Sequence, residues 1–285
     1  MSKVGLVVDS TCDLTPEWLA AHDITMVPLT VLFGSEEFLD WVELRPDEFY
    51  EKLASYPGLP KTSQPTPAAF SEAYASLAQQ GCEEIVSIHL SGPLSGTIQS
   101  ATLAAAEAPV PVHVVDTHKV TQAVALCIIE AMSARDAGAS AEEIADVARR
   151  AAQNTRLFFL LDTLDYLVKG GRAGKAQALA ASLLNIKPVL EMNADGIIEP
   201  FKKVRGERQA IQALVDTVVE DAARLGHLKL GLLHACHPDR MTNLKQLILD
   251  SGADVEIVTE GTIGAVIGTY AGPGALGVTY LPARA

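Results

Sequence analysis

The sequence predicts an α/β protein with two domains: a three-layer α/β/α domain around a parallel four-stranded sheet, then a two-layer α/β domain with a mixed six-stranded sheet. Three observations lead to this prediction. The chain has 285 residues, more than one hydrophobic core usually serves. In the first half, apolar runs rich in Val and Ile alternate with helical patterns, as buried parallel strands do. In the second half, an Asp-Gly turn joins two apolar runs, which predicts an antiparallel hairpin within a mixed sheet.

Four apolar runs are the expected strands of the first domain. They are KVGLVVDS (3–10), ITMVPLTVLF (24–33), EEIVSIHLS (83–91) and VPVHVVDT (110–117). Residues 34–70 are instead polar and rich in proline until a helix begins near Pro67. We expect this stretch to be a long excursion that ends in a loop, and long ordered loops are more often functional than idle.

Six candidate strands follow in the second domain. They are LFFLLDTL (157–164), KPVLEMN (187–193), IIEPFKKV (197–204), LKLGLLHA (228–235), DVEIVTE (254–260) and ALGVTYL (275–281). Helices are expected at residues 175–184, at about 207–225 and at 240–251. In the longest helix, apolar residues recur at helical spacing, which predicts one face packed on the sheet. We place the domain boundary near residue 155, so that the domains span residues 1–155 and 156–285.

Charge and hydropathy narrow the class of protein. Lys and Arg total 22 against 35 Asp and Glu, which gives a formal net charge of −13. Such a chain repels phosphate backbones and anionic membrane surfaces, so nucleic acid is not an expected partner. No run approaches the ~20 apolar residues that a membrane span requires, and the N-terminus lacks the long apolar core of a signal peptide. We therefore expect a cytoplasmic protein with no integral membrane association.

No set of residues in the sequence predicts catalysis or a metal site. The seven histidines are scattered, and neither a Ser-His-Asp set nor a pair of carboxylates stands out. The four cysteines are far apart, and His234, Cys236 and His237 would point to opposite faces of a strand end. Residues 9–11 follow the first strand and are expected near the crevice at the carboxyl ends of the parallel strands, unless they only begin a helix.

The most informative segment is SIHLSGPLSGTIQSA (87–101). A strand is expected to end at Leu90, a Ser/Gly loop follows, and a helix is expected to begin near Thr97. Free backbone N–H groups at a helix N-terminus bind anions, and Gly96 lets a ligand approach the backbone. Ser95 and Thr97 could add hydroxyl donors. The alternative is that these hydroxyl groups only cap the helix.

Two further segments strengthen the ligand interpretation. In KTSQPTP (61–67), Thr62 and Ser63 precede two prolines that stiffen the chain by fixing φ. In GTIGAVIGTYAGPGALGV (261–278), six glycines surround Tyr270. Such density indicates close backbone contact with a ligand or another element, although turns between strands would also explain it. The Tyr270 hydroxyl could donate to a carboxylate, yet a partly buried tyrosine needs no ligand to explain it.

Two basic segments stand out in this acidic chain. KGGRAGK (169–175) does not match the nucleotide-binding loop G-x-x-x-x-G-K-[ST], because Lys169 occupies the first glycine position and Ala176 follows the second lysine. We therefore predict no ATP binding there. Arg205 and Arg208 begin a helix. An exposed arginine is usually only solvated, but here it could meet a phosphate or an acidic partner.

With these residues in view, the chain resembles the DegV family, the fatty-acid-binding proteins called FakB in some bacteria. The resemblance runs nearly end to end, through VVDSTCDL, KTSQPTPAAF, LSGPLSGTIQSA, LDTLDYLVKGGRAGKA, LLNIKPVL and IGAVIGTYAGPGALGV in that order. It implies a two-domain fold shared with the substrate subunit of dihydroxyacetone kinases. It also implies that the chain is not itself an enzyme. The expected ligand is a long-chain fatty acid held between the domains, with no other cofactor, and the expected partner is a separate ATP-dependent fatty acid kinase.

The resemblance also assigns residues. Carried over by motif, the hydroxyl groups of Thr62 and Ser95 hold the carboxylate, with Ser63 and the amides of Gly96 and Thr97 close by. Arg205 matches an arginine needed when the bound acid is phosphorylated. Tyr270 stands where the family commonly has histidine; a tyrosine can replace its hydrogen bond but cannot carry its positive charge.

A dry apolar tunnel is the main physical requirement of this hypothesis, because the tail supplies most of the affinity. The candidate wall residues are Leu160, Leu164, Leu167, Leu183, Leu184, Ile186, Val189, Ile263 and Ile267. Two other functions stay open. An enzyme acting on a small ketone, as dihydroxyacetone kinase does, rests on the shared fold alone. A regulatory or scaffold protein rests on Arg205 and the acidic surface.

Overall fold

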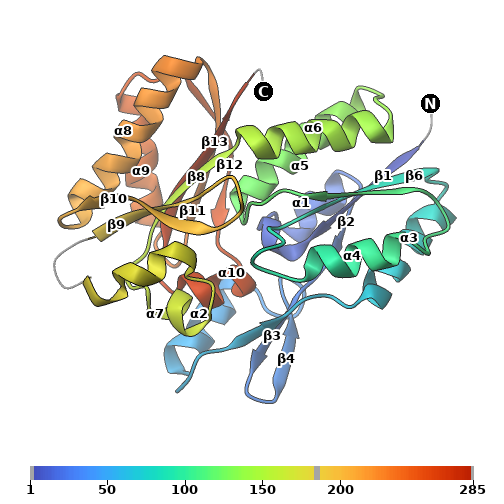
Figure 1. The fold of residues 1–285 in the computed structure, drawn as a ribbon, viewed down its shortest axis with the longest axis horizontal. Coiled ribbons are helices and arrows are strands. Elements are labelled where there is room, and N and C mark those ends of the chain that lie inside the picture. The colour runs from blue at the N-terminus through green and yellow to red at the C-terminus, as the bar shows by residue number, and fades with distance from the viewer. Residues whose placement is uncertain (1–2, 183–186, 284–285) are drawn as a thin grey trace.

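The computed structural model describes residues 3–182 and 187–283. They form two bodies, each built on its own large sheet, which we call the N-terminal and C-terminal domains (Figure 1). The predicted boundary near residue 155 falls between the last helix of the first body and the first strand of the second. None of the helices within these ranges is both long enough and apolar enough to cross a membrane.

The N-terminal domain contains the predicted parallel sheet of four strands, in the order β2-β1-β6-β7. Its strands are β1 (Val4–Asp9), β2 (Ile24–Val27), β6 (Glu84–His89) and β7 (Val112–Asp116). Every residue of the central strand β1 is buried, as expected for a parallel sheet with helices on both faces. A short 3-10 turn, η1 (Ser10–Cys12), follows β1, so residues 10–12 do begin a helical turn.

Helices cover both faces of this sheet and give the domain its three layers. One face packs against α1 (Pro16–Ala21), α5 (Gln122–Asp136) and α6 (Ala141–Asn154). The other face packs against α3 (Pro67–Gln79) and α4 (Thr97–Ala105). The starts of α3 and α4 agree with the sequence signals, and the Thr66 hydroxyl caps α3 by accepting from the Ala69 N–H at 3.2 Å.

The second predicted run, residues 24–33, is not one strand, which corrects that prediction. Pro28 has no N–H to donate to a sheet, and the chain leaves the parallel sheet there. The second half of the run is β3 (Thr30–Phe33), which pairs antiparallel with β4 (Glu36–Leu39) and β5 (Lys61–Ser63) in a separate sheet. Helix α2 (Pro46–Ser55) lies between β4 and β5 in the chain. The excursion is therefore more regular than predicted, and Thr62 lies on a strand.

The C-terminal domain contains the predicted mixed sheet, in the order β10-β9-β8-β13-β11-β12. Its strands are β8 (Arg156–Leu160), β9 (Lys187–Met192), β10 (Ile198–Val204), β11 (Leu228–His234), β12 (Val255–Thr262) and β13 (Leu276–Pro282). The Asp-Gly turn joins β9 and β10 as an antiparallel hairpin, as predicted. Helices α8 (Glu207–Leu225) and α9 (Pro238–Asp250) pack on one face of the sheet.

The opposite face of this sheet is turned toward the N-terminal domain, where α5 contacts β11, β12 and β13 (Figure 1). Two short helices lie at the lower end of this seam, α7 (Asp165–Lys169) and α10 (Ala265–Ala271). The helix expected at residues 175–184 is instead a 3-10 helix, η2 (Gly174–Ser182), and Leu184 lies outside the described residues.

Candidate functional site

A cavity of about 300 Å³ lies where the two domains meet. This volume is at the lower end of the range for small-molecule sites. Segments of both domains line it, and most of the lining is apolar. The apolar lining residues are Leu29, Leu90, Leu94, Val120, Leu157, Phe159, Leu161, Leu167, Ile198, Leu233, Ile263, Val266, Ile267, Ala271 and Ala275.

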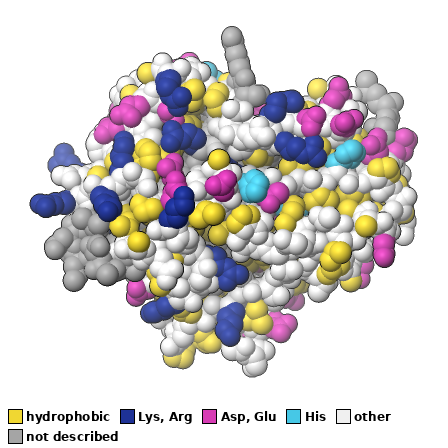
Figure 2. Space-filling model, viewed as in Figure 1, with side chains coloured by type: hydrophobic (Ala, Val, Ile, Leu, Met, Phe, Trp, Pro, Cys, Tyr) yellow, Lys and Arg dark blue, Asp and Glu magenta, His cyan; other side chains and the backbone are white. Residues whose placement is uncertain are grey.

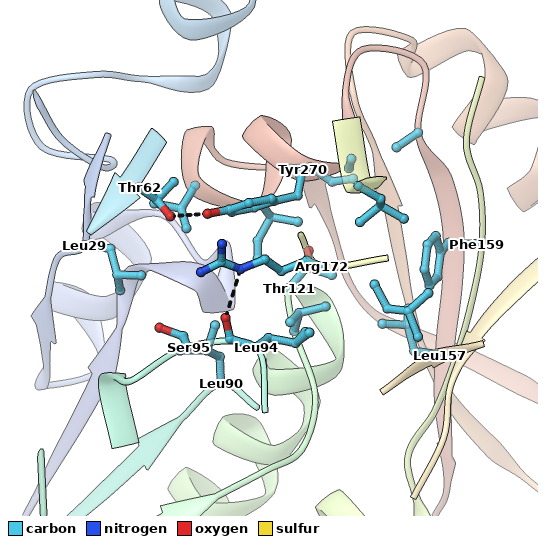
Figure 3. Close-up of a pocket in the computed structure, with 18 of the residues that line it drawn as sticks. Leu29, Thr62, Leu90, Leu94, Ser95, Thr121, Leu157, Phe159, Arg172 and Tyr270 are labelled. Carbon is cyan, nitrogen blue, oxygen red and sulfur yellow. Dashed lines mark hydrogen bonds between the residues drawn. The ribbon is translucent and has the colours of Figure 1, made fainter. Parts of the chain in front are cut away.

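Polar side chains gather at one end of this cavity. Figure 3 shows Thr62, Ser95, Arg172 and Tyr270 pointing toward one another, while Leu157 and Phe159 lie at the far end. The Thr62 and Tyr270 hydroxyl oxygens are 2.7 Å apart and share a hydrogen bond. The Arg172 guanidinium lies over the Tyr270 ring, 4.8 Å from its centroid, which is a favourable cation–π distance. This end, which we call the polar end, therefore joins a strand, two loops and a helix.

The predicted Ser/Gly loop contributes to the polar end and precedes helix α4, whose N-cap residue is Gly96. Ser95 lines the cavity, and its hydroxyl oxygen accepts from the Thr97 N–H at 3.3 Å and lies 2.9 Å from the Thr97 hydroxyl oxygen. Gly96 lines the cavity as well, and a Cβ at this position would collide with the Gln64 side chain. Thr97 is buried behind Ser95 and does not line the cavity. Ser95 therefore accepts from the first N–H of α4 from one residue before the N-cap, and it also lines the cavity.

Thr62 and Ser63 reach the polar end from β5. Both line the cavity, with Thr62 partly buried and Ser63 exposed at the rim. The Ser63 hydroxyl donates to the Gln64 carbonyl at 3.4 Å, which is a weak contact. Of the two neighbouring hydroxyl groups, that of Thr62 is therefore the one fixed in place, through its bond to Tyr270.

The glycines near Tyr270 are explained by close packing and by backbone conformation. A Cβ at Gly170, just after α7, would collide with the Tyr270 ring. Gly272 ends α10 with φ +71°, and a Cβ there would collide with the Tyr166 ring. Helices α7 and α10 therefore approach closely because glycine faces tyrosine on each side. This packing sets the position of the Tyr270 hydroxyl.

Arg172 was not among the site residues predicted from the sequence. Its Nε donates to the Leu94 carbonyl at 3.3 Å and its Nη1 to the Gly170 carbonyl at 2.9 Å, so the side chain is held across the seam between the domains. Its segment, KGGRAGK, showed a mismatch to the nucleotide-binding loop and formed part of the family resemblance, but neither assigned the arginine a role. The sequence signal that could have indicated Arg172 is an arginine flanked by glycines, because glycines let backbone segments pack closely. The polar end consequently includes a cation, which the predicted set of hydroxyl and amide donors did not.

Arg205 lies away from the cavity. It is exposed between β10 and α8 and does not line the cavity, and its backbone N–H donates to the Gln209 side-chain carbonyl at 3.2 Å. Within residues 3–182 and 187–283, no group of three His, Cys, Asp or Glu side chains is placed to hold a metal ion.

The predicted apolar wall is partly wrong. Leu167, Ile263 and Ile267 line the cavity. Leu160 and Val189 instead pack in the core beneath α8 and α9, and Leu164 is buried without lining the cavity. Leu183, Leu184 and Ile186 lie outside the described residues. Successive side chains of a strand point to opposite faces, and on β8 the cavity side belongs to Leu157 and Phe159.

A family model and similar proteins of known sequence agree on one family. The family model described as "Uncharacterised protein, DegV family" matches residues 3–283. A DegV domain-containing protein of Streptomyces coelicolor is 39% identical over 275 residues, which cover 96% of this chain and 97% of that protein.

Solved structures of similar proteins share the fold. A DegV family protein from Thermus thermophilus, described by its fatty acid binding, superposes with a TM-score of 0.92 at 34% identity, covering 98% of this chain and 99% of that one. DegV from Bacillus subtilis, described as a fatty acid binding protein, superposes with a TM-score of 0.90 at 31% identity, covering 99% of each chain.

Proposed function

Since the chain belongs to the DegV family, we propose that it binds one long-chain fatty acid between its two domains. The observation that carries this proposal is the apolar cavity at the domain seam, with its hydrogen-bond donors and its cation gathered at one end. The similar proteins from Thermus thermophilus and Bacillus subtilis are described as binding fatty acids. A long aliphatic acid has the same division into an apolar tail and a polar head.

In this proposal the carboxylate lies at the polar end and the tail runs toward Leu157 and Phe159. Burial of ~15 methylenes at about 0.8 kcal/mol each amounts to a gross gain near 12 kcal/mol before the ordering costs. The hydroxyl groups of Thr62, Ser95 and Tyr270 contribute about 1 kcal/mol each. The tail therefore provides affinity, and the polar end provides orientation.

Arg172 supplies the charge that a buried carboxylate needs. Moving an ionised carboxylate out of water is costly unless an opposite charge or several donors compensate it. The Arg172 side chain is partly buried, and its Nε and Nη1 are already engaged with backbone carbonyls. Its guanidinium carries five N–H donors, so it can meet the carboxylate while it stays anchored.

We further propose that the protein is a carrier that presents the carboxylate to a separate ATP-dependent fatty acid kinase in the cytoplasm. The polar end is the end nearer to solvent, because Ser63 and Gln64 at its rim are exposed. Arg205 is exposed and away from the cavity, where a partner protein could contact it without displacing the ligand. This partner is tested by incubating the loaded carrier with ATP and such a kinase, and measuring acyl phosphate by capture with hydroxylamine.

The ligand itself is tested on the purified protein. Mass spectrometry after denaturation should release one C14 to C18 acid per chain, and protein stripped of lipid should bind added palmitate or oleate. The absence of lipid together with no binding of either acid would contradict the proposal.

A small-ketone enzyme is less well supported by the same cavity. A hydrophilic triose would leave the long apolar lining uncovered, and no observation at the polar end favours a covalent bond to a ketone. Turnover of dihydroxyacetone with a phosphate donor would reverse this preference.

A further inference from the structure

Helix α10 carries part of the cavity wall, and its amino end is held by the N-terminal domain. Val266, Ile267 and Tyr270 lie on α10 and line the cavity. Just before and at the start of the helix, the Gly264 N–H donates to Asp13 Oδ1 and the Ala265 N–H donates to Asp40 Oδ1, each at 3.0 Å. Asp13 follows η1 and Asp40 follows β4, so both carboxyl groups reach α10 from the other domain. We call Asp13 and Asp40 the acid clamp.

The contacts of the clamp leave little room for adjustment. A Cβ at Gly264 would collide with both the Trp41 indole nitrogen and Asp13 Oδ1, and the Trp41 indole N–H donates to the same Asp13 oxygen at 3.2 Å. The Tyr50 hydroxyl donates to the Ile263 carbonyl at 3.1 Å. Asp13, Asp40 and Tyr50 of the N-terminal domain therefore hold the residues just before and at the start of α10 in place.

The buried carboxyl groups near this seam do not receive equally complete sets of hydrogen bonds. Asp9 accepts from the backbone N–H groups of Thr11 and Leu90, from the Thr11 hydroxyl and from the His89 ring. Asp40 has a donor on each oxygen, Ala265 N–H on Oδ1 and the Ser10 hydroxyl on Oδ2 at 2.7 Å. Asp13 has both of its donors on Oδ1, and within the described residues its Oδ2 has no hydrogen-bond partner.

Asp13 neighbours a residue that lines the cavity. Its neighbour is Thr121, whose hydroxyl oxygen is also buried and lacks a hydrogen-bond partner in the part of the chain that the structure describes. Thr121 lines the cavity (Figure 3). An ionised Asp13 Oδ2 can only accept from that hydroxyl and leaves a full charge buried at the seam, whereas a protonated Oδ2 can also donate to it and is neutral.

We propose that Asp13 and Asp40 are positioning residues of the fatty acid site: they fix the amino end of α10, and the charge of Asp13 sets how closely Tyr270 approaches Thr62. This inference rests on the proposed function. It adds that affinity for the acid depends on a proton held outside the cavity, at the seam between the domains.

Burial makes this proton available near neutral pH. Desolvation raises the pKa of Asp13 to about 7, against the nearby Thr121 hydroxyl and the hydrogen bonds from Gly264 and Trp41, which lower it. Desolvation also raises the pKa of Asp40, and the charge of Asp13 raises it further. Asp13 is therefore the clamp residue that loses its proton as the pH passes through about 7, and the charge that is then buried at the seam loosens the contact.

The other titratable groups around Asp13 are few. Asp9 and Cys12 face it from the end of β1 and from η1, and Tyr50 faces it from α2; burial raises the pKa of the Cys12 thiol and of the Tyr50 hydroxyl. Asp13 also lines a second cleft of about 840 Å³ between the domains, which gives protons a route to it. The charged residues that share this cleft are Arg45, Asp47, Lys245 and Glu260.

The fluorescence of Trp41 reports on the acid clamp without any ligand. The chain has two tryptophans, so a Trp18→Phe variant leaves the Trp41 indole, bonded to Asp13, as its only tryptophan fluorophore. We expect Trp41 emission to titrate near pH 7 in this background and to lose that transition when Asp13→Asn is added. Asp216→Asn, an exposed aspartate on α8, is the matched control and should keep the transition.

Affinity for oleate then tests the effect on the site. Between pH 6 and pH 8 we expect the wild type to lose roughly fivefold in affinity, the size of one impaired hydrogen bond. Asp13→Asn keeps an acceptor for Gly264 and Trp41 and should flatten this loss, whereas Asp13→Ala should bind more weakly at both pH values. Ionisation of oleate itself is common to all variants and cancels in the comparison.

The outcomes separate the two proposals. If no fatty acid binds under any condition, the proposed function fails, while the Trp41 titration still reports on the clamp. If oleate binds and the Asp13→Asn profile follows that of the wild type, the positioning role is overturned. Unaltered Trp41 emission from pH 5.5 to pH 8.5 would overturn it as well, even where a variant folds poorly.

Discussion

The two ends of the cavity are built in different ways. The polar end takes Thr62 from β5, Ser95 from the loop before α4, Arg172 from the loop after α7 and Tyr270 from α10. At the far end lie Leu157 and Phe159, which are both on β8 of the C-terminal sheet. The polar end therefore depends on how the two domains sit together, whereas Leu157 and Phe159 are held by a single strand. If the proposed acid binds here, its orientation and its affinity are set by separate parts of the fold.

The largest effect should come from filling the far end. Replacing Leu157 with Trp would exclude about four tail methylenes, and with some overpacking the loss of binding for a C18 acid should be about 4 kcal/mol, close to a thousandfold. A C12 acid should lose much less because its tail ends earlier. Titration of the stripped protein with C12, C16 and C18 acids measures the difference.

A neighbouring residue on the same strand gives the control for that prediction. Leu160 faces the core beneath α8 and α9, so Leu160→Trp should lower thermal stability without changing the preference for chain length. An equal loss for all three acids in Leu157→Trp would mean that the tail does not reach β8.

At the polar end, the largest effect should come from the cation. Arg172→Met keeps an apolar stem and removes the guanidinium, and the loss of charge-assisted hydrogen bonds should weaken acid binding by about 2 kcal/mol, roughly thirtyfold. Hexadecanol, which has no charge, should bind both proteins about equally. Lys169→Met, an exposed change close by in the chain, serves as the control, and an equally large effect there would point to general electrostatics.

A smaller effect is expected from the hydroxyl pair. Thr62→Val and Tyr270→Phe should each weaken acid binding by about 1 kcal/mol, roughly fivefold. The double variant should lose less than the sum, because the two hydroxyl groups share one hydrogen bond of 2.7 Å. Isothermal titration calorimetry of the wild type, the two single variants and the double variant completes this double-mutant cycle. Strictly additive losses would show that the two side chains act on the ligand independently.

Much of the fold could be predicted because its signals are local. The apolar runs of β1, β6 and β7 and the Asp-Gly turn between β9 and β10 each specify structure within a few residues. The small sheet of β3, β4 and β5 was missed because its strands are short, with the polar Thr62 and Ser63 on β5. Its pairing is set by distant contacts, which a hydropathy pattern does not record.

Residues of the candidate site that lie in sequence motifs could be predicted, whereas residues that only the fold brings together could not. Ser95 and Thr62 came from hydroxyl-rich loops, and both line the cavity. Arg172 and Asp13 are placed by hydrogen bonds to residues far away in the chain. Arg172 donates to the Leu94 carbonyl, and Asp13 accepts from the Gly264 N–H. Leu160 was assigned to the wall because a continuous apolar run does not show which face of β8 meets the cavity.

The smallest effect on the cavity should come from Arg205, although a resemblance assigns it a role. Arg205 is exposed and outside the lining, so Arg205→Ala should change oleate affinity by less than about twofold, within the usual range for a surface substitution. If its role is to contact a kinase, the same variant should lower the rate of ATP-dependent acyl phosphate formation while the carrier stays fully loaded. Arg208→Ala, three positions further along the chain, is the matched control. A loss of oleate affinity in Arg205→Ala comparable to that in Arg172→Met would instead place Arg205 at the polar end, and the separation between ligand binding and partner contact would not hold.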